Sequence, residues 1–238
     1  RDGAPEFAIG RIPARTSAQL QLALGSLLER AAIPPERYFA TSGQSAPGER
    51  FGAHSRSLLS HLRQGQAIDF ALVDEVGLGT ARAQTIQALA GDADWINYAG
   101  HSSPSRWGFE NLLNTQGLAS ITRTGPGAVI SQWGCWNNYF VLPDQNSMAD
   151  ALMFESNGLA AAVIGSSSLA EDASHMALAV RFFDLVEDGR FDENPMLPVN
   201  TLGEALMQAK RDLANGAPEH IGSNYSMQLF GDPAQPLR

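Results

Sequence analysis

Two short, mostly apolar runs in this chain, residues 94–100 and 128–134, each end in a glycine. They are rich in branched and aromatic residues, as strands buried on both faces of a mostly parallel sheet are. His101 follows the first run directly, and Cys135, the only cysteine of the chain, follows the second. Because parallel strands place their carboxyl ends at one edge of the sheet, where open α/β folds bind ligands, we expect this imidazole and this thiol to meet there.

The remaining apolar periodicity predicts strands that alternate with amphipathic helices. Thr16 is expected to cap the first helix, with Gln19 in the capping-box position. Segment 33–51 is rich in Pro, Gly, Ser and Gln, which predicts a long surface loop, and segment 102–110 predicts a polar loop that carries Trp107. Further strands are expected at residues 6–11, 68–73, 159–164 and 225–230, and helices at 16–30 (apolar stripe Leu20, Leu24, Leu27 and Leu28), 55–63, 79–89, 147–157, 173–186 and 201–213.

This order of elements predicts an α/β sandwich with helices on both faces of the sheet and right-handed crossovers. The length of 238 residues, without an internal repeat or a convincing linker, predicts one domain over residues 1–238. The chain begins with Arg1 and has no signal-peptide pattern, so we expect it to be part of a longer precursor.

Composition narrows the classes of function. A hydrophobic fraction of 44% and a charged fraction of 17% are ordinary for a globular protein. The net charge of −9 disfavours nucleic acid or an anionic membrane as the main partner and suits cationic peptides. No apolar stretch approaches the roughly 20 residues of a spanning helix. A single cysteine excludes an internal disulfide framework, and no His and Cys stand at metal-ligand spacing, so we predict no metal site and no required cofactor. The acidic loops leave a structural calcium ion open, although no contiguous calcium-loop pattern is present.

A thiol and an imidazole at one sheet edge are the parts of a nucleophilic acyl-transfer enzyme. Taken singly, Cys135 is more often a packing residue, since free cysteine is among the most buried residue types. The shared setting of Cys135 and His101 favours function, because Gly100 and Gly134 let the backbone turn sharply and approach a substrate closely. The other four histidines lack such a setting and are interpreted as surface or packing residues: His54, His61, His175 and His220.

Residues 94–107 resemble the histidine motif of the gingipain-type cysteine peptidases, which have a caspase-like fold. The segment that ends at Cys135 resembles the nucleophile motif of that family, and the separation of His101 from Cys135 also fits. The resemblance touches both ends of the chain and is weak from about residue 33 to 92. It continues in residues 5–11, 147–152, 162–166, 201–205 and 229–233.

The resemblance implies a caspase-like three-layer sandwich and a cysteine endopeptidase. Cys135 would form a thioester with the acyl half of a peptide, while His101 would polarise the scissile carbonyl and protonate the leaving amine. Backbone N–H groups beside these residues would hold the oxyanion, which brings Gly100, Ser102 and Gly134 into the site. The family usually has glycine at the position of Ser102, where a positive φ would be strained.

An acidic residue upstream of His101 would orient the imidazole in the family. Glu49, Asp69, Asp74 and Glu75 are the candidates, and we favour Asp69 and Asp74 because they flank a predicted strand. The alternative for each is a solvated charge at a strand end.

Substrate preference is implied by the loop after the strand at 159–164, which in the family lines the pocket for the side chain before the cut. Glu171 and Asp172 lie there and would pair with a Lys or Arg of the substrate. Alternatively, both acids stabilise the N-terminus of the next helix. Trp107 and Trp136 are expected to wall the cleft, with a core position as the alternative.

Two other functions stay open. The sequence around Ser102 resembles the G-x-S-x-G nucleophile elbow of serine hydrolases, although Pro104 replaces the last glycine. A catalytically silent caspase-like domain that binds partners or acts as a scaffold is the second, and the presence of both His101 and Cys135 argues against it. The resemblance further implies a peptide or protein substrate, a pro-segment or other domains of the same precursor, and a secreted or cell-surface bacterial location.

Overall fold

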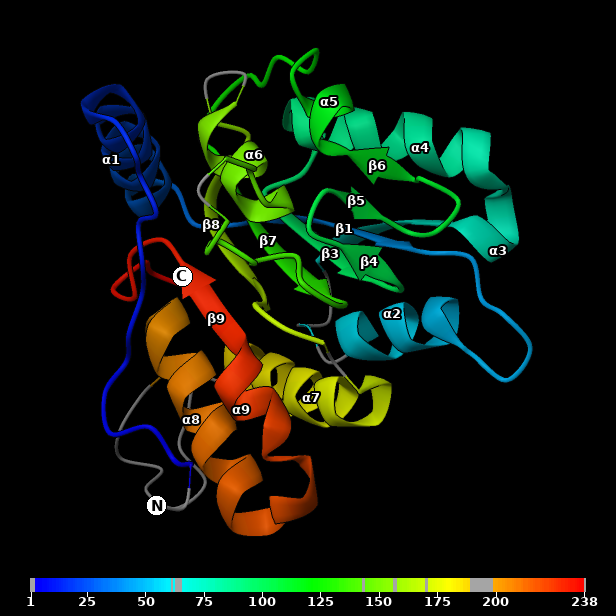
Figure 1. The fold of residues 1–238 in the computed structure, drawn as a ribbon, viewed down its shortest axis with the longest axis vertical. Helices are drawn as coiled ribbons and strands as arrows, with labels where there is room; N and C mark the ends of the chain where they lie inside the picture. Colours follow the sequence, from blue (N-terminus) through cyan, green and yellow to red (C-terminus); the bar gives the residue numbers. More distant parts are fainter. Residues whose placement is uncertain are drawn as a thin grey trace.

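A six-stranded sheet with the order β2-β1-β3-β7-β8-β9 forms the centre of the molecule (Figure 1). The computed structural model describes residues 3–60, 62, 66–142, 144–155, 158–169, 171–188 and 199–237. Strands β2 to β8 of this order run parallel to one another, and β9 runs antiparallel to β8. The prediction of a mostly parallel sheet is confirmed. Its strands are β1 (Arg37–Ser42), β2 (Ala67–Leu72), β3 (Trp95–Ala99), β7 (Ala128–Trp133), β8 (Ala160–Ser166) and β9 (Met227–Phe230).

Helices cover both faces of the sheet, as expected for an α/β sandwich (Figure 1). Two separate hydrophobic clusters, one on each side of the sheet, bury the apolar faces of these helices. The first cluster is covered by α2 (Phe51–Ser60), α7 (Asp172–Asp188) and α8 (Leu202–Gly216), and the second by α4 (Leu78–Gln87), α5 (Thr115–Leu118) and α6 (Met148–Phe154). The other helical segments are α1 (Ser17–Ala32), α3 (Val73–Val76), η1 (Ala88–Asp92), η2 (Pro218–His220) and α9 (Gly222–Ser226).

The central strands β3 and β7 are buried along their whole length, which explains their nearly continuous apolar sequences. Several of their buried polar groups form hydrogen bonds across the two strands. Asn97 accepts hydrogen bonds from the Ser131 hydroxyl at 2.8 Å and from the Trp133 indole at 2.9 Å, and Ser131 in turn accepts one from Trp95 at 3.1 Å. A shift in register would leave these buried groups unpaired, so the network fixes how β3 and β7 align.

The loop predicted for residues 33–51 is wrong in its first half, because β1 lies there between β2 and β3. Its polar residues had suggested a surface segment. In the structure Thr41 is fully buried and donates to the carbonyl of Ala71 at 2.8 Å, while its own carbonyl accepts from the Ser55 hydroxyl. Buried polar side chains that find such partners do not prevent a strand from being central.

The polar loop predicted for residues 102–110 is also wrong. It holds β4 (Ser102–Ser103) and β5 (Arg106–Trp107), which join β6 (Leu113–Asn114) in a small antiparallel sheet. Trp107 is completely buried, stacks on Tyr98 with ring centroids 4.5 Å apart, and donates to the side chain of Gln132 at 2.8 Å. This tryptophan is therefore a core residue.

Helix α1 starts as predicted, since the Thr16 side chain accepts from the backbone N–H of Gln19 at 3.2 Å. Its predicted apolar stripe is wrong except at Leu27. The helix instead packs through Ala23, Ser26, Leu27 and Arg30, because Arg30 must reach a buried ion pair with Asp94. Leu20, Leu24 and Leu28 are consequently exposed.

Three further elements differ from their predicted bounds. Of the strand expected at residues 6–11, only Arg11 forms a bridge, to Phe230. The helix expected at 55–63 begins earlier and is described to Ser60, and the helix expected at 147–157 is described to Phe154. Residues 61, 63–65, 143 and 156–157 lie outside the described residues.

Candidate active site

His101 and Cys135 line the same cavity, of about 190 Å³, at the carboxyl edge of the sheet. The register explains this, because Ser42, Ala99 and Trp133, which end β1, β3 and β7, lie side by side. The structure thus brings the two residues expected at this edge to one cavity. The other lining residues are Glu49, Phe51, Gly100, Trp133, Gly134, Asp172 and His175.

Two glycines allow the strand ends to approach one another. Gly100 has a φ of 155°, and a Cβ atom there would lie 2.7 Å from the Tyr98 hydroxyl and 2.8 Å from the backbone nitrogen of Gly43. A Cβ at Gly134 would lie 2.5 Å from the carbonyl oxygen of Gly100. These distances are too short for any side chain, so both positions require glycine.

The imidazole of His101 is held from three sides. Its Nε2 lies 2.7 Å from Oε1 of Glu49, Phe51 contacts its ring edge-on at 5.1 Å, and Phe109 stacks on it at 4.5 Å. Glu49 is itself fixed, because its other oxygen accepts from the backbone N–H of Ala46 at 2.7 Å. The bond from Ala46 and the interactions with His101 outweigh burial and lower the pKa of Glu49.

An ionised Glu49 can only accept hydrogen bonds, so Nε2 of His101 carries the proton. The Nδ1 atom is then the ring nitrogen that can take up and return a proton. Cys135 is half-buried and lines the same cavity as His101.

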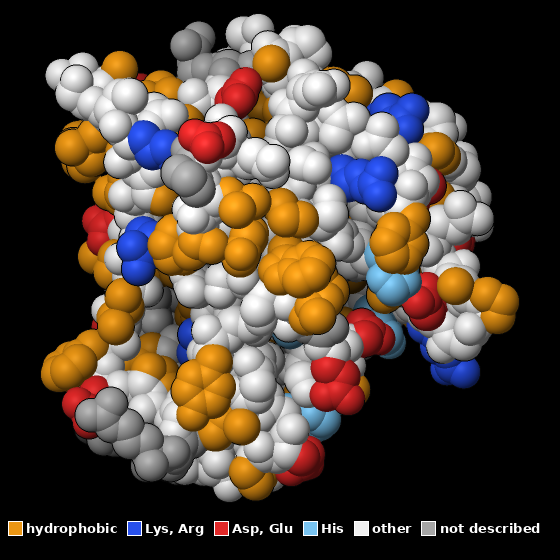
Figure 2. Space-filling model, viewed as in Figure 1, with side chains coloured by type: hydrophobic (Ala, Val, Ile, Leu, Met, Phe, Trp, Pro, Cys, Tyr) orange, Lys and Arg blue, Asp and Glu red, His pale blue; other side chains and the backbone are white. Residues whose placement is uncertain are grey.

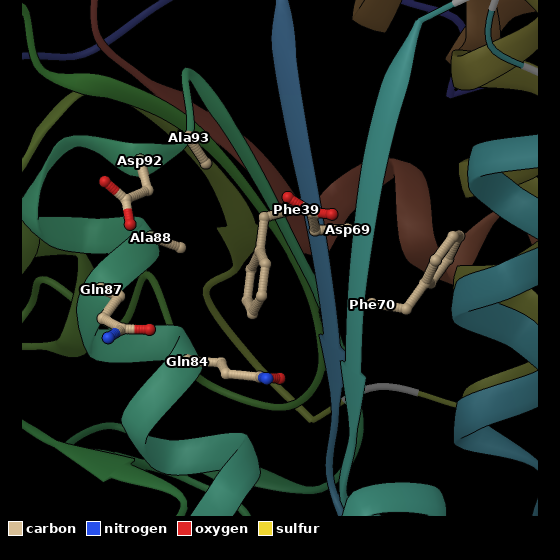
Figure 3. A pocket seen from close by; sticks show the side chains of 8 residues that line it. All are labelled: Phe39, Asp69, Phe70, Gln84, Gln87, Ala88, Asp92 and Ala93. Carbon is tan, nitrogen blue, oxygen red and sulfur yellow. The ribbon is translucent and has the colours of Figure 1, made fainter.

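Neither acid favoured from the sequence, Asp69 or Asp74, makes a hydrogen bond to His101 in the described structure. Asp69 lines a separate cavity of about 220 Å³ between strands β1 and β2 and helix α4, where Gln84 points toward the strands (Figure 3). Asp74 accepts from the backbone N–H of Ser45 at 3.1 Å and so anchors the loop that carries Glu49. Recognising β1 would have favoured Glu49 among the four candidates, because Gly43 follows β1 as Gly100 and Gly134 follow β3 and β7, and Glu49 lies in the loop after it.

The two acids predicted to select the substrate lie in neighbouring cavities. Asp172 lines the Cys135 cavity at the start of α7, with its carboxylate 3.6 Å from Nδ1 of His54. Glu171 lines a second cavity of about 340 Å³ and accepts from the Ser174 hydroxyl at 2.8 Å. Acidic and histidine side chains gather on the side of the molecule where α2 and α7 lie (Figure 2).

His175 is a site residue that the sequence interpretation assigned to packing or to the surface. It lies in the first turns of α7, is only 2% exposed, and lines both cavities. Burial lowers its pKa to about 4, so the ring is neutral near pH 7. The available signal was its position one turn into the helix that follows the loop after β8.

Neither Trp107 nor Trp136 is among the residues that line the Cys135 cavity; Trp133 contributes the aromatic wall. Trp136 follows the cysteine with a φ of 57°, and its N–H donates to the carbonyl of Ser168 at 2.9 Å. That bond ties the backbone after Cys135 to the loop after β8.

Comparison with known proteins shows the family of the chain. The model of peptidase family C25 matches residues 1–238. The chain belongs to peptidase family C25. No curated protein matches it.

Among solved structures, this C25 chain is similar to the Arg-specific cysteine proteinase gingipain R (RgpB), with 19% identity and a TM-score of 0.83 over 100% of this chain and 57% of that chain. It is also similar to the complex of the pro- and mature domains of RgpB from Porphyromonas gingivalis, with 20% identity and a TM-score of 0.82 over 100% and 58%. A third structure, described as a protease, has 16% identity and a TM-score of 0.75 over 99% and 57%. The C25 chain thus has the caspase-like gingipain fold and spans less than two thirds of the length of these solved chains.

Ser102 adopts an unstrained conformation in this C25 chain. Among the described residues other than glycine, only Asn111 and Trp136 have a positive φ. The Ser102 hydroxyl donates to the carbonyl oxygen of Cys135 at 2.7 Å. The side chain therefore links the two strand ends of the site, and it lies in β4 rather than at the strand-to-helix turn that a serine nucleophile elbow needs.

No group of three or more metal-ligating side chains occurs among the described residues of the C25 chain. In the same part of the chain, no helix is both long and apolar enough to cross a bilayer.

Proposed function

We propose that this chain is a cysteine endopeptidase domain in which Cys135 is the nucleophile and His101 is the general acid and base. The observation that carries the proposal is that both residues line one cavity while Glu49 holds Nε2 of His101. Membership of peptidase family C25 supports the same chemistry.

In this mechanism, the Cys135 sulfur attacks the scissile carbonyl carbon, and the carbonyl oxygen becomes an oxyanion. His101 takes the thiol proton on Nδ1 and delivers it to the amine nitrogen as the C–N bond breaks. Water, deprotonated by the same nitrogen, then attacks the thioester and releases the carboxylic acid and the free thiol. Glu49 stabilises the imidazolium that forms in each half of the reaction, because its carboxylate already contacts Nε2.

The oxyanion is assigned to backbone N–H groups at the two strand ends, next to Gly100 and Gly134. Both glycines line the cavity and let the backbone approach the substrate. Ser102 supports this arrangement by holding the carbonyl of Cys135. Loss of one such donor costs about 3 kcal/mol of transition-state stabilisation.

For the side chain before the cut, we propose a Lys or Arg. Asp172 supplies a carboxylate inside the Cys135 cavity, and Glu171 supplies one in the neighbouring cavity. No Lys or Arg is among the described residues that line the two cavities, so the local charge favours a cationic group.

The test is covalent labelling of the chain with peptidyl acyloxymethyl ketones that end in Lys, Arg or norleucine, followed by intact mass measurement. We expect one adduct per wild-type molecule, no adduct with Cys135→Ala, and strongly slowed labelling with His101→Ala. Faster labelling by the Lys and Arg reagents than by the norleucine reagent is the expected sign of the acidic pocket.

Two results would overturn the proposal. A wild-type thiol that reacts with none of these reagents would favour a silent scaffold domain. Labelling of Ser102 by a fluorophosphonate would favour a serine hydrolase. Equal labelling by basic and neutral reagents would remove only the proposed preference for Lys or Arg.

A further inference from the structure

The Cys135 cavity and the cavity beside Glu171 have one lining residue in common, His175. The first has a volume of about 190 Å³ and contains Asp172; the second has about 340 Å³ and contains Glu219 as well as Glu171. His175 therefore stands between the cavity that contains Cys135 and the cavity that contains Glu171.

One ring nitrogen of His175 has no hydrogen-bond partner among the described residues. The residue is 2% exposed, and no described residue hydrogen-bonds its Nε2 atom, which has no contact with solvent. A buried polar nitrogen without a partner destabilises a protein unless a ligand or water supplies the missing bond. Its backbone N–H donates to the carbonyl of Glu171 at 3.0 Å, which fixes the position of the residue in the first turn of α7.

The charged groups around the two cavities are mostly acidic. Asp172 faces the first cavity with His54 3.6 Å away, and Glu171 and Glu219 face the second. The Ser174 hydroxyl donates to the Glu171 carboxylate at 2.8 Å, which keeps that carboxylate in place. A neutral imidazole among these carboxylates adds a hydrogen-bond acceptor without adding a positive charge.

Building on the proposed function, we infer that His175 is a specificity-determining residue. Its ring accepts a hydrogen bond from the cationic end of the Lys or Arg side chain that precedes the scissile bond. The side chain thereby reaches from the Cys135 cavity toward Glu171.

The experiment compares four fluorogenic peptides that differ only in the residue before the cut: Lys, its neutral analogue norleucine, Arg, and its neutral analogue citrulline. The wild type is measured beside His175→Leu, which removes the acceptor, and His175→Gln, which retains one. We expect His175→Leu to lower the Lys-to-norleucine and Arg-to-citrulline ratios of kcat/KM by about tenfold, mainly through KM. His175→Gln should keep both ratios within about threefold of the wild type.

His220→Leu is the matched control, because His220 contacts the same Ser174 but is not among the residues that line either cavity. Its ratios should equal those of the wild type. The rate at which iodoacetamide alkylates Cys135 should stay unchanged in every variant, since that reagent needs no substrate side chain.

The outcomes separate this inference from the proposed function. Unchanged ratios in His175→Leu, or equal losses for charged and neutral peptides, would overturn the role of His175 and leave the peptidase intact. A wild type that cleaves norleucine and Lys peptides equally would also overturn it. A wild type that cleaves none of the four peptides and is not labelled at Cys135 would overturn both.

Discussion

The polar residues at the two edges of the central sheet differ in how fully they are paired. Those at the amino edge form ion pairs with one another, and those at the carboxyl edge line a cavity. At the amino edge, Asp94 precedes β3 and forms ion pairs with Arg30 at 3.2 Å and with Arg37 at 3.2 Å. Arg30 is completely buried, and its guanidinium also donates to the carbonyls of Gly127, Ile33 and Pro126. At the carboxyl edge, the polar residues surround a cavity, and Nε2 of His175 has no partner among the described residues.

The comparison indicates that the amino edge of the sheet contributes to the stability of the fold, whereas the carboxyl edge carries the candidate site. Burial raises the pKa of Asp94, but the bonds from Arg37 and the charges of Arg30 and Arg37 outweigh it and lower that pKa. Such a closed network holds β1, β3 and α1 together. At the carboxyl edge, hydrogen-bonding groups line a cavity, and the glycines there let the strand ends approach one another closely.

The largest expected effect is on the amino edge. We expect Asp94→Asn to lower the free energy of unfolding by about 3 to 5 kcal/mol, because the Arg30 charge would stay buried without its partner. Urea unfolding at pH 7 measures this. Since the folded-state pKa of Asp94 is depressed below 3.8, its stabilisation is present above that pH and is lost as the pH falls through the folded value. A variant within about 0.5 kcal/mol of the wild type would show that this network does not hold the fold.

The second effect belongs to the carboxyl edge. The pKa of His175 falls from 6.5 to about 4 on folding, so the unfolded chain binds a proton that the folded chain rejects between these values. Above pH 6.5 the ring is neutral in both states and has no effect; as the pH falls from 6.5 toward 4, the free energy of unfolding decreases by about 3 kcal/mol in all. Urea unfolding at a series of pH values should show a flatter profile for His175→Gln than for wild type. His220→Gln is the control, and parallel profiles for all three proteins would refute the buried neutral ring.

The third prediction concerns the acid that holds His101. Glu49→Gln should lower kcat/KM for a peptide substrate by about 10- to 100-fold, because the charge-assisted bond to Nε2 is lost. Asp69→Asn should leave kcat/KM within about twofold, since Asp69 lies in a different cavity. Equal effects of the two substitutions would contradict the assignment of Glu49.

The smallest effect is expected at Ser102. Removing its hydroxyl in Ser102→Ala deletes one hydrogen bond to the carbonyl of Cys135, which should lower kcat by about fivefold. The free energy of unfolding should change by less than about 1 kcal/mol. Complete loss of activity in this variant, with Cys135 still reactive toward iodoacetamide, would instead favour Ser102 as a nucleophile.

The positions of His101 and Cys135 could be predicted from the sequence because the signals are local. A buried strand needs a continuous apolar run, and a sharp turn at its end needs glycine, so β3 and β7 and the residues after them are visible in the chain itself. The same holds for the cap of α1 at Thr16 and for most of the helices.

Tertiary structure alone decided the rest. Strand β1 lies in a segment that is polar on both sides of Tyr38, Phe39 and Ala40, and the polar Thr41 is buried because it finds partners on β2 and α2. Its placement beside β3 brings Glu49 to His101, and the packing of α7 brings His175 to the wall of two cavities. These contacts join residues far apart in the chain, and neither local propensity nor periodicity carries information about which distant groups will satisfy one another.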